Sequence, residues 1–314
     1  MSLVSIFVSA IAPVVAIAAV GYLLGRTRGL DVGALNTVVV YVFAPALVFH
    51  SLLTADIDPE TVARLGLAVV AFVGVMTVLA ELAVRAGGVD EPLASATVLT
   101  GVYPNSGNYG IPLSTFAFGG VGQSTAVLYL AVQSVLVYTH GVYVAARSGG
   151  NAGRGALERV FTIPLVYAVV LALLVRALGV GPPEGGTLLQ TLDLVGSAAI
   201  PLMLVILGSE LVGTDVRGAL GVLSLATGLK LLVAPLVALG IALALGVSGT
   251  VGAVFVLECA TPAAVTPLIL LVEFGDVDAD VAGEFASSVV LVSTLLSVVT
   301  VTVLVSLLQN GVVL

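Results

Sequence analysis

The chain is poor in charged residues, which make up only 9% of its 314 residues, against about 25% in an average soluble domain. Hydrophobic residues make up 59%, and the mean hydropathy is +1.23. A soluble fold of this length could not bury so much apolar surface, so we expect lipid to be its solvent. The net charge of −8 and the scattered basic residues argue against nucleic acid as a partner.

Cysteine and N-terminal basic residues are also scarce. Cys259 is the only cysteine, which excludes an intramolecular disulfide and a cysteine-rich metal site. No basic residue precedes the first apolar run, residues 3–24, whereas a cleaved signal peptide has a positive start and a shorter apolar core. We expect this run to be the first transmembrane helix of the mature protein, and we expect neither a metal site nor a cofactor.

Ten segments are long and apolar enough to cross a bilayer, which takes about 20 apolar residues. The connections are short and hold most of the charge. The sequence therefore predicts an all-α integral membrane protein with ten transmembrane helices. The ten predicted spans are residues 3–24, 32–53, 62–86, 92–118, 121–146, 160–178, 187–212, 217–246, 249–274 and 281–309.

The first five spans and the last five echo each other. Pro45 and Pro201 are 156 positions apart (201 − 45), and so are Phe118 and Phe274 (274 − 118). An odd number of spans in each half places the second half upside down, which is the inverted repeat of many carriers. We expect a first repeat over 1–146, a cytoplasmic linker over 147–159 and a second, inverted repeat over 160–314.

The arginines predict the orientation in the membrane. If the N-terminus is external, seven arginines fall in cytoplasmic connections and two in external ones. Because cytoplasmic loops carry an excess of Lys and Arg, we expect a multi-pass protein of the cell membrane with both termini external. The seven are Arg26, Arg28, Arg85, Arg147, Arg154, Arg159 and Arg217, and the two are Arg64 and Arg176.

Prolines interrupt the fourth and ninth spans at corresponding places. Residues 103–112 read YPNSGNYGIP, and residues 258–267 read ECATPAAVTP. Proline removes a backbone donor and clashes with the preceding turn, so neither span can be one unbroken helix. Paired breaks of this kind mark the substrate site of secondary transporters. The residues expected to shape the two breaks are Pro104, Pro112, Pro262 and Pro267.

Two half-helices are expected to begin inside these breaks, at about residues 108–111 and at about residue 263. Helix N-termini carry unpaired N–H groups and roughly half a positive charge, so two of them aimed at one cavity favour an anion. The alternative is that the nearby polar residues only satisfy the backbone around a kink. The predicted substrate-binding residues are Asn105, Ser106, Asn108, Tyr109 and Thr261.

Glu258 and Lys230 are ionisable residues predicted at membrane depth, where a charge is costly and is therefore a candidate for function. Both are coupling candidates: they could form a buried pair, Glu258 could bind the proton or sodium ion of a coupled transporter, and Lys230 could attract an anion. Glu258 could also face a water-filled vestibule without a transport role. Gln133 could line the cavity or hold helices together. His140 is interpreted as a polar cap, with a proton relay as the less favoured reading.

The residues around the breaks form recognisable strings. Residues 104–105, 110–113 and 118–119 read PN, GIPL and FG, and residues 262–265 read PAAV. These strings resemble the fourth-span and ninth-span signatures of the auxin efflux carrier family, whose plant members are the PIN proteins. The similarity covers essentially the whole chain, as in a short, prokaryote-like member that lacks the long cytoplasmic loop of the plant proteins.

The resemblance implies a crossover of spans 4 and 9. It also implies a scaffold of spans 1, 2, 6 and 7 that mediates a homodimer, and a moving transport part of spans 3–5 and 8–10. By motif position, Asn105 would be the crossover asparagine that contacts a substrate carboxylate. Prokaryote-like members of this length are associated with small dicarboxylates or unassigned organic anions.

The predicted function is thus that of a secondary transporter, not an enzyme. Its substrates would be small organic anions, either auxin-like carboxylates or dicarboxylates, carried by alternating access, and coupling to H+ or Na+ is compatible with this plan. One alternative is a cation/proton antiporter of similar plan, which would need carboxylates at the crossover, where only Glu258 qualifies. The other alternative is a ligand sensor that transports nothing.

Overall fold

A computed structural model describes residues 3–55, 57–148, 164–183, 185–214, 216, 220–274 and 279–311. Seven helices within these ranges are long and apolar enough to cross a membrane. Three further apolar helices are shorter, namely Leu93–Val102, Pro164–Leu178 and Gly249–Ala260. The prediction of an all-helical protein with several membrane-spanning helices is confirmed, whereas ten spans in two inverted repeats stay a prediction. Most of the predicted linker, residues 149–159, lies outside the described ranges.

The helices before the first break form three long apolar rods, two of which contain a π-helical turn. Their elements are α1 (Leu3–Ile6), η1 (Phe7–Ile11), α2 (Ala12–Arg28), α3 (Val32–Val38), η2 (Val39–Phe43), α4 (Ala44–Thr54) and α5 (Pro59–Ala86).

The fourth and fifth predicted spans are joined at a kink. Their elements are α6 (Leu93–Val102), η3 (Ser106–Gly110), α7 (Ile111–Leu136), η4 (Val137–Gly141), α8 (Val142–Ala145) and η5 (Ala146–Ser148). Inside α7, Gly119 has φ 64° and ψ −148°. A positive φ is favourable mainly for glycine, so the chain turns here, between the predicted ends of these spans.

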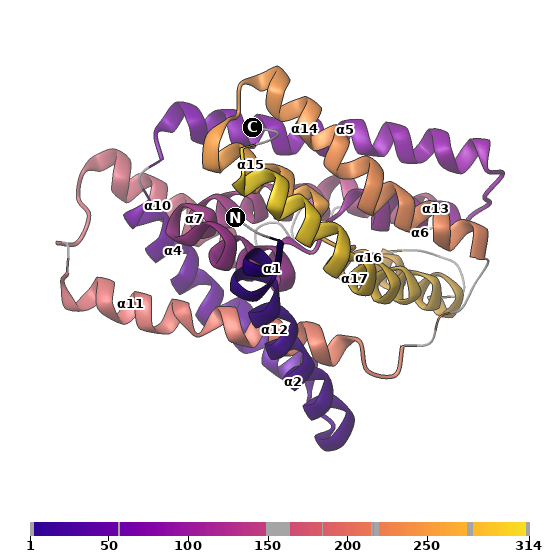
Figure 1. The fold of residues 1–314 in the computed structure, drawn as a ribbon, viewed down its shortest axis with the longest axis horizontal. Helices are drawn as coiled ribbons and strands as arrows, with labels where there is room; N and C mark the ends of the chain where they lie inside the picture. The colour runs from indigo at the N-terminus through magenta and orange to yellow at the C-terminus, as the bar shows by residue number, and fades with distance from the viewer. Residues whose placement is uncertain are drawn as a thin grey trace.

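The remaining described elements are also apolar helices, some of them interrupted. They are α10 (Pro164–Leu178), α11 (Thr187–Ser197), α12 (Ala199–Glu210), α13 (Leu220–Gly228), η6 (Leu229–Val233), α14 (Ala234–Leu245), α15 (Gly249–Ala260), α16 (Thr266–Phe274) and α17 (Ala279–Gln309). Figure 1 shows α5 and α14 along one edge of the molecule and α11 and α12 along the opposite edge, with α7 between them.

A π-helical turn precedes a proline in four of these helices. The prolines at positions 13, 45, 112 and 235 each stand second in the α-helix that follows η1, η2, η3 or η6. Proline cannot donate to the carbonyl four residues earlier and its ring crowds that carbonyl. The wider π-turn moves that carbonyl away, so the helix continues through the proline instead of ending.

Both proline-marked breaks predicted from the sequence are present. Between α6 and η3, residues 103–105 leave the helical conformation, and residues 261–265 do so between α15 and α16. The second half-helix begins at Thr266, three residues later than predicted. The delay arises because Ala263 pairs with the other break in extended conformation and cannot also start a helix.

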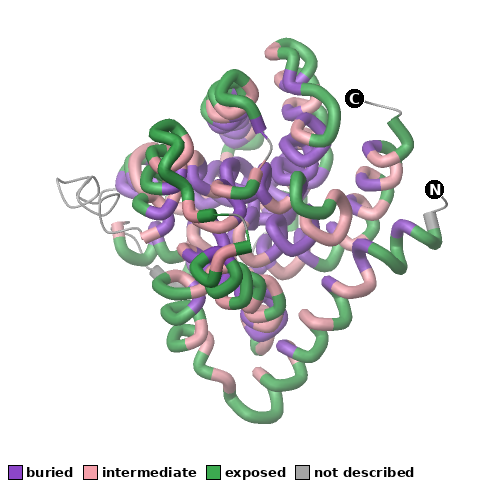
Figure 2. Tube along the Cα trace, turned by 90° about the vertical axis from the view of Figure 1, so that its left-hand side faces the viewer, coloured by how far each residue is buried: buried purple, intermediate pink, exposed green. Residues whose placement is uncertain are grey.

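The exterior of the bundle is apolar. Figure 2 shows buried residues gathered along the middle of the molecule and exposed residues around it. Many of the exposed residues are large and apolar, and Leu194, for example, is 76% exposed. This distribution is unfavourable in water and favourable in lipid, which agrees with the composition.

Helices α2 and α12 cross at very short range. A Cβ atom added to Gly21 would overlap the backbone of Val205, and one added to Gly208 would overlap the backbone of Ala18. The Ser209 hydroxyl donates to the carbonyl of Gly21 at 2.8 Å. Small residues at the crossing and an interhelical hydrogen bond are what hold membrane helices together, since lipid provides no hydrophobic driving force.

The start of α5 gives a first prediction. Asp58 accepts from the Thr61 hydroxyl at 2.6 Å and from the Thr61 backbone N–H at 2.9 Å, and these bonds hold the pKa of Asp58 below its ordinary value of 3.8. Because the folded-state pKa is lowered, the cap stabilises the protein above 3.8 and is lost as the pH falls further. We expect Asp58→Ala to lower the unfolding temperature at neutral pH.

The measurement is thermal unfolding in detergent over a pH series. The difference between Asp58→Ala and the parent protein should shrink as the pH falls below 3.8. A difference that stays constant over the whole series would contradict the assignment of the cap.

Candidate functional site

The two broken helices meet through their main chains. The Asn105 N–H donates to the Pro262 carbonyl at 2.8 Å, and the Ala264 N–H donates to the Tyr103 carbonyl at 3.2 Å. Pro104 and Ala263 thereby form an isolated antiparallel bridge. Backbone groups freed by a break must find partners in lipid, and here each break supplies partners for the other. We call residues 103–105 and 262–264 the junction.

Asn105 starts the helix that follows the first break. Its side-chain oxygen accepts from the Asn108 N–H at 3.2 Å, and its carbonyl accepts from the Gly110 N–H at 2.9 Å. Asparagine is a preferred N-cap residue for this reason. Because the cap uses the amide oxygen of Asn105, the amide NH2 group is the part of the side chain left to donate to a ligand.

Gln133 of α7 ties this segment to the next helix. Its Nε2 donates to the Pro104 carbonyl at 3.0 Å, and its Oε1 accepts from the Ser106 hydroxyl at 3.1 Å. The sequence allowed two roles for Gln133, lining a cavity or holding helices together. The structure shows both, because Gln133 donates to the junction and borders a cavity.

A cavity of about 240 Å³ lies beside the junction. One side of it is formed by the junction, η3, α7 and α16, and the other by α3, η2, α10 and α12. None of the described lining residues is ionisable apart from Tyr138. The polar lining residues nearest the breaks are Asn105, Ser106, Asn108, Gln133 and Thr266.

Two helix starts border this cavity. Ser106 and Asn108 belong to the first turn of η3, which continues into α7, and Thr266 is the first residue of α16. Helix N-termini present N–H groups and partial positive charge. A solute in the cavity therefore meets two weakly positive ends without a basic side chain, which favours an anion.

Two of the predicted binding residues lie away from this cavity. Tyr109 lines a second cavity, of about 450 Å³, between α2, α12 and α17, and its hydroxyl is bonded to the Ser297 hydroxyl at 3.1 Å. Successive helical residues point about 100° apart, so Tyr109 does not share the direction of Asn108. Thr261 is fully buried, and its hydroxyl donates to the Glu258 carbonyl at 2.8 Å. Thr261 therefore satisfies the backbone around the break, which was the alternative to a binding role.

The four prolines sit at the positions that shape the breaks. The carbonyls of Pro104 and Pro262 accept the hydrogen bonds described above. Pro112 and Pro267 each stand second in a helix, α7 and α16 respectively. A proline in the first turn lacks only an N–H that would have no helical partner, and its fixed φ suits the helix start.

Glu258 lies behind the first half-helix, not in the cavity. Its Oε1 accepts from the Ser114 hydroxyl at 2.7 Å, whereas Oε2 has no hydrogen-bond partner among the described residues. The Ser106 hydroxyl is close to the same carboxyl, but its single proton is directed to Gln133. A Cβ atom on Gly110 would overlap the carboxyl group. The carboxyl is thus packed tightly against the start of α7.

Lys230 supports the end of α15. Its Nζ donates to the Cys259 carbonyl at 3.0 Å and lies 5.8 Å from the centre of the Phe72 ring. Within the described part of the chain, no ion pair joins Lys230 to Glu258. A cation near the last carbonyls of a helix is stabilising, so Lys230 serves the half-helix that ends at the junction.

The fold and the site together define a class of protein, namely a polytopic membrane protein whose broken helices meet beside a small cavity with several polar lining residues, as in membrane transporters. The model of a family described as "Membrane transport protein" matches residues 6–154 and 154–305. The chain therefore belongs to this family, which is the auxin efflux carrier family that the sequence resembles.

Two relatives are similar over nearly their whole length. An "Uncharacterized transporter" of Methanothermobacter thermautotrophicus is 30% identical over 270 residues, which cover 86% of each chain. A "Putative malonate transporter" of Rhizobium meliloti is 26% identical over 309 residues, which cover 93% of this chain and 92% of that protein.

Proposed function

We propose that this protein is a secondary transporter that carries small organic anions across the cell membrane by alternating access. The proposal rests chiefly on one observation, namely that the junction of the two breaks borders the 240 Å³ cavity. The proposal includes the predicted arrangement of ten spans in two inverted repeats. It also includes external termini and a homodimer formed by the scaffold spans.

The cavity favours a small carboxylate. Its volume of about 240 Å³ is below the roughly 300–1,000 Å³ of pockets for drug-sized ligands. The amide groups of Asn105, Asn108 and Gln133 and the two helix starts supply donors for carboxylate oxygens. The name of the Rhizobium relative, a malonate transporter, points to the same chemistry.

The position of the cavity suits alternating access. One wall comes from the helices predicted to form the scaffold (α3, α10, α12), and the other from the junction and helices of the predicted transport part (α7, α16). A shift of one wall against the other would open the cavity to one side and close it to the other. Glu258 and Lys230 are not assigned a coupling role in this proposal, because both are fully buried and neither lines the cavity.

Counterflow in liposomes tests the function. Protein reconstituted into liposomes loaded with unlabelled malonate should accumulate labelled malonate from outside, and an excess of external acetate or succinate will show the size preference. Choline serves as the cation control. Binding of malonate without counterflow would favour a sensor, and sodium-driven proton flux that is insensitive to organic anions would favour an antiporter.

Asn105→Asp is the sharpest variant at this site. Aspartate keeps the N-cap to Asn108 but replaces the amide donor by a negative charge facing the anion. We expect malonate counterflow to fall by tenfold or more, since hydrogen bonds to charged groups contribute about 1.5–3 kcal/mol. The unfolding temperature should change little. Asn310→Asp, at an exposed asparagine that bonds Ser306, is the matched control; unimpaired counterflow in Asn105→Asp would refute the assignment.

A further inference from the structure

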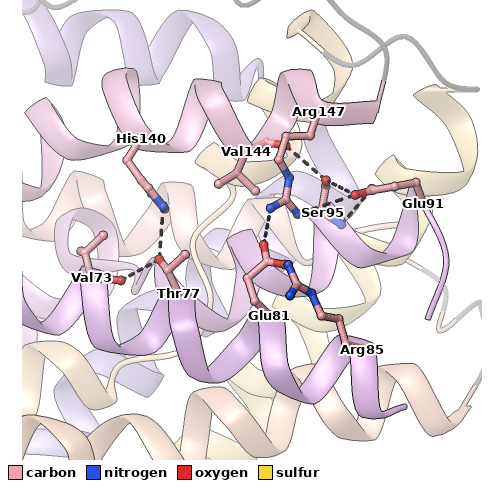
Figure 3. A network of polar contacts seen from close by, with 9 residues as sticks. All are labelled: Val73, Thr77, Glu81, Arg85, Glu91, Ser95, His140, Val144 and Arg147. Atoms are coloured by element: carbon pink, nitrogen blue, oxygen red, sulfur yellow. Dashed lines mark hydrogen bonds and ion pairs between the residues drawn. The ribbon is translucent and has the colours of Figure 1, made fainter. Parts of the chain in front are cut away.

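His140 is held by two hydroxyl groups from distant parts of the chain. Its Nδ1 lies 2.8 Å from the Tyr103 hydroxyl, and its Nε2 lies 3.2 Å from the Thr77 hydroxyl. The ring is on η4, Thr77 is on α5, and Tyr103 ends α6. Figure 3 shows the ring pointing to Thr77, which in turn bonds the carbonyl of Val73.

Each of these hydroxyls also has a carbonyl partner. The Thr77 hydroxyl lies 2.6 Å from the Val73 carbonyl, and the Tyr103 hydroxyl lies 2.9 Å from the Leu136 carbonyl. A hydroxyl has one proton, and a carbonyl can only accept. When both protons go to the carbonyls, both ring nitrogens of His140 must donate, which is the charged imidazolium.

The neutral ring is accommodated by the same atoms. If Nδ1 carries no proton, the Tyr103 hydroxyl turns its proton from the Leu136 carbonyl to Nδ1, while Nε2–H still donates to Thr77. On protonation, a hydronium ion gives a proton to Nδ1 and leaves as water, and Tyr103 returns its own proton to Leu136. The site thus has partners for both protonation states.

Tyr103 connects this ring to the junction. Its side chain is fully buried, and its own carbonyl accepts the Ala264 N–H from the other break. A change in the hydrogen bond of its hydroxyl therefore occurs on a residue that holds the two breaks together. Gly141, next to His140, also lies against the Tyr103 ring, so this contact is tight.

A cluster of charges lies on the same side of the bundle as His140. Arg147 pairs with Glu81 and with Glu91, and Glu81 is also near Arg85; Figure 3 shows this cluster beside His140 and Thr77.

The other elements packed against η4 add few ionisable groups. The acidic residue of α16 is Glu273, which is exposed, and α6 contributes Tyr103, whose hydroxyl is the Nδ1 partner. The charged side chains on this side of the bundle are therefore Glu81, Glu91, Arg85 and Arg147. They lie at the end of the bundle that the arginines predict to be cytoplasmic.

We propose that His140 is the proton-binding site of this transporter, and that a proton bound there is carried together with the organic anion. Thr77 and Tyr103 are its positioning residues. The inference rests on the proposed function, since it assigns the coupling ion and its site. From the sequence, Glu258 and Lys230 were the coupling candidates, and His140 was interpreted as a polar cap with a proton relay as the less favoured reading.

The test compares two modes of transport in the same liposomes. Malonate exchange at equal pH on both sides needs no net proton movement, whereas net uptake driven by an acidic exterior does. We expect the parent protein to show uptake stimulated at least fivefold by the gradient, with alkalinisation outside reported by a pH dye. His140→Gln should retain exchange and lose the stimulation.

Two further variants make the outcome decisive. His50→Gln replaces the other histidine, which faces Asp193 at 3.7 Å, and should keep the full stimulation. Thr77→Val removes the hydrogen-bond partner of Nε2 and should shift the pH of half-maximal uptake while exchange persists. This variant still tests the proposal if His140→Gln folds poorly. Stimulation that survives in His140→Gln, an unshifted pH profile in Thr77→Val, or no proton movement in the parent would overturn the proposal. Absence of malonate exchange in the parent would instead refute the proposed function.

Discussion

Gly208→Ala is expected to lower the unfolding temperature of the protein strongly. The added methyl group would overlap the Ala18 carbonyl and approach the Tyr22 nitrogen, which are backbone atoms of α2. A side chain could rotate away, but the backbone of a packed helix cannot, so α2 and α12 would have to separate along their whole contact. We expect a cost at or above the roughly 1–3 kcal/mol typical of overpacking.

The measurement is the unfolding temperature in detergent, together with the yield of monodisperse protein. Gly240→Ala is the matched control, because Gly240 lies within helix α14 with no atom within 4 Å of an added Cβ. Alanine is the better helix former by about 1 kcal/mol, so this control should be neutral or stabilising. Equal unfolding temperatures for the two variants would contradict the close crossing.

Gly110→Ala is expected to have the second largest effect. Gly110 ends η3, and an added Cβ atom would overlap the carboxyl group of Glu258. The backbone of Gly110 is already helical, with φ −66°, so conformational strain does not contribute and the cost arises from the overlap alone. We expect a loss of roughly 1–3 kcal/mol in the free energy of unfolding and a fall in malonate counterflow, because η3 carries Ser106 and Asn108.

The double variant Gly110→Ala/Glu258→Ala isolates this contact. Removing the carboxyl group makes room for the methyl group, so the double variant should be more stable than the sum of the two single effects predicts. Residues in contact couple by about 0.5–3 kcal/mol. Gly107→Ala, in the same turn, meets only Leu130 Cδ2 at 3.8 Å and should cost little. Strict additivity in the double-variant cycle would show that the overlap does not determine the effect.

The broken helices were predictable because proline acts locally. Pro104 and Pro262 remove donors and crowd the preceding turn, and their matched places in the fourth and ninth predicted spans marked both breaks. Prolines alone would not have done so, because helices continue through Pro13, Pro45 and Pro235. The turn at Gly119 falls at the predicted boundary between the spans ending at residue 118 and beginning at residue 121. The long apolar helices followed from composition, since about 20 apolar residues suffice for each.

The contacts inside the site were less predictable, because they join residues far apart in the chain. His140 meets partners 63 and 37 positions away, and no local pattern announces such pairs. Asn108 and Tyr109 are adjacent in one helical turn and cannot share a direction, but spacing did not show which of them faces the cavity, because η3 is a π-turn and not an α-turn. Lys230 was predicted to pair with Glu258 or attract an anion, but its partner is a main-chain carbonyl, which every residue carries.

The antiparallel bridge between Pro104 and Ala263 depends less on side-chain identity than the cavity beside it does. Its hydrogen bonds use main-chain atoms only, so most changes of side chain leave them intact. The neighbouring residues at positions 106, 108 and 133, in contrast, line the cavity. Under the proposed function, descendants of this chain can therefore acquire new cargoes through changes at position 108 while the main-chain bridge is inherited unaltered. Position 133 is less free, because its side chain also donates to the Pro104 carbonyl.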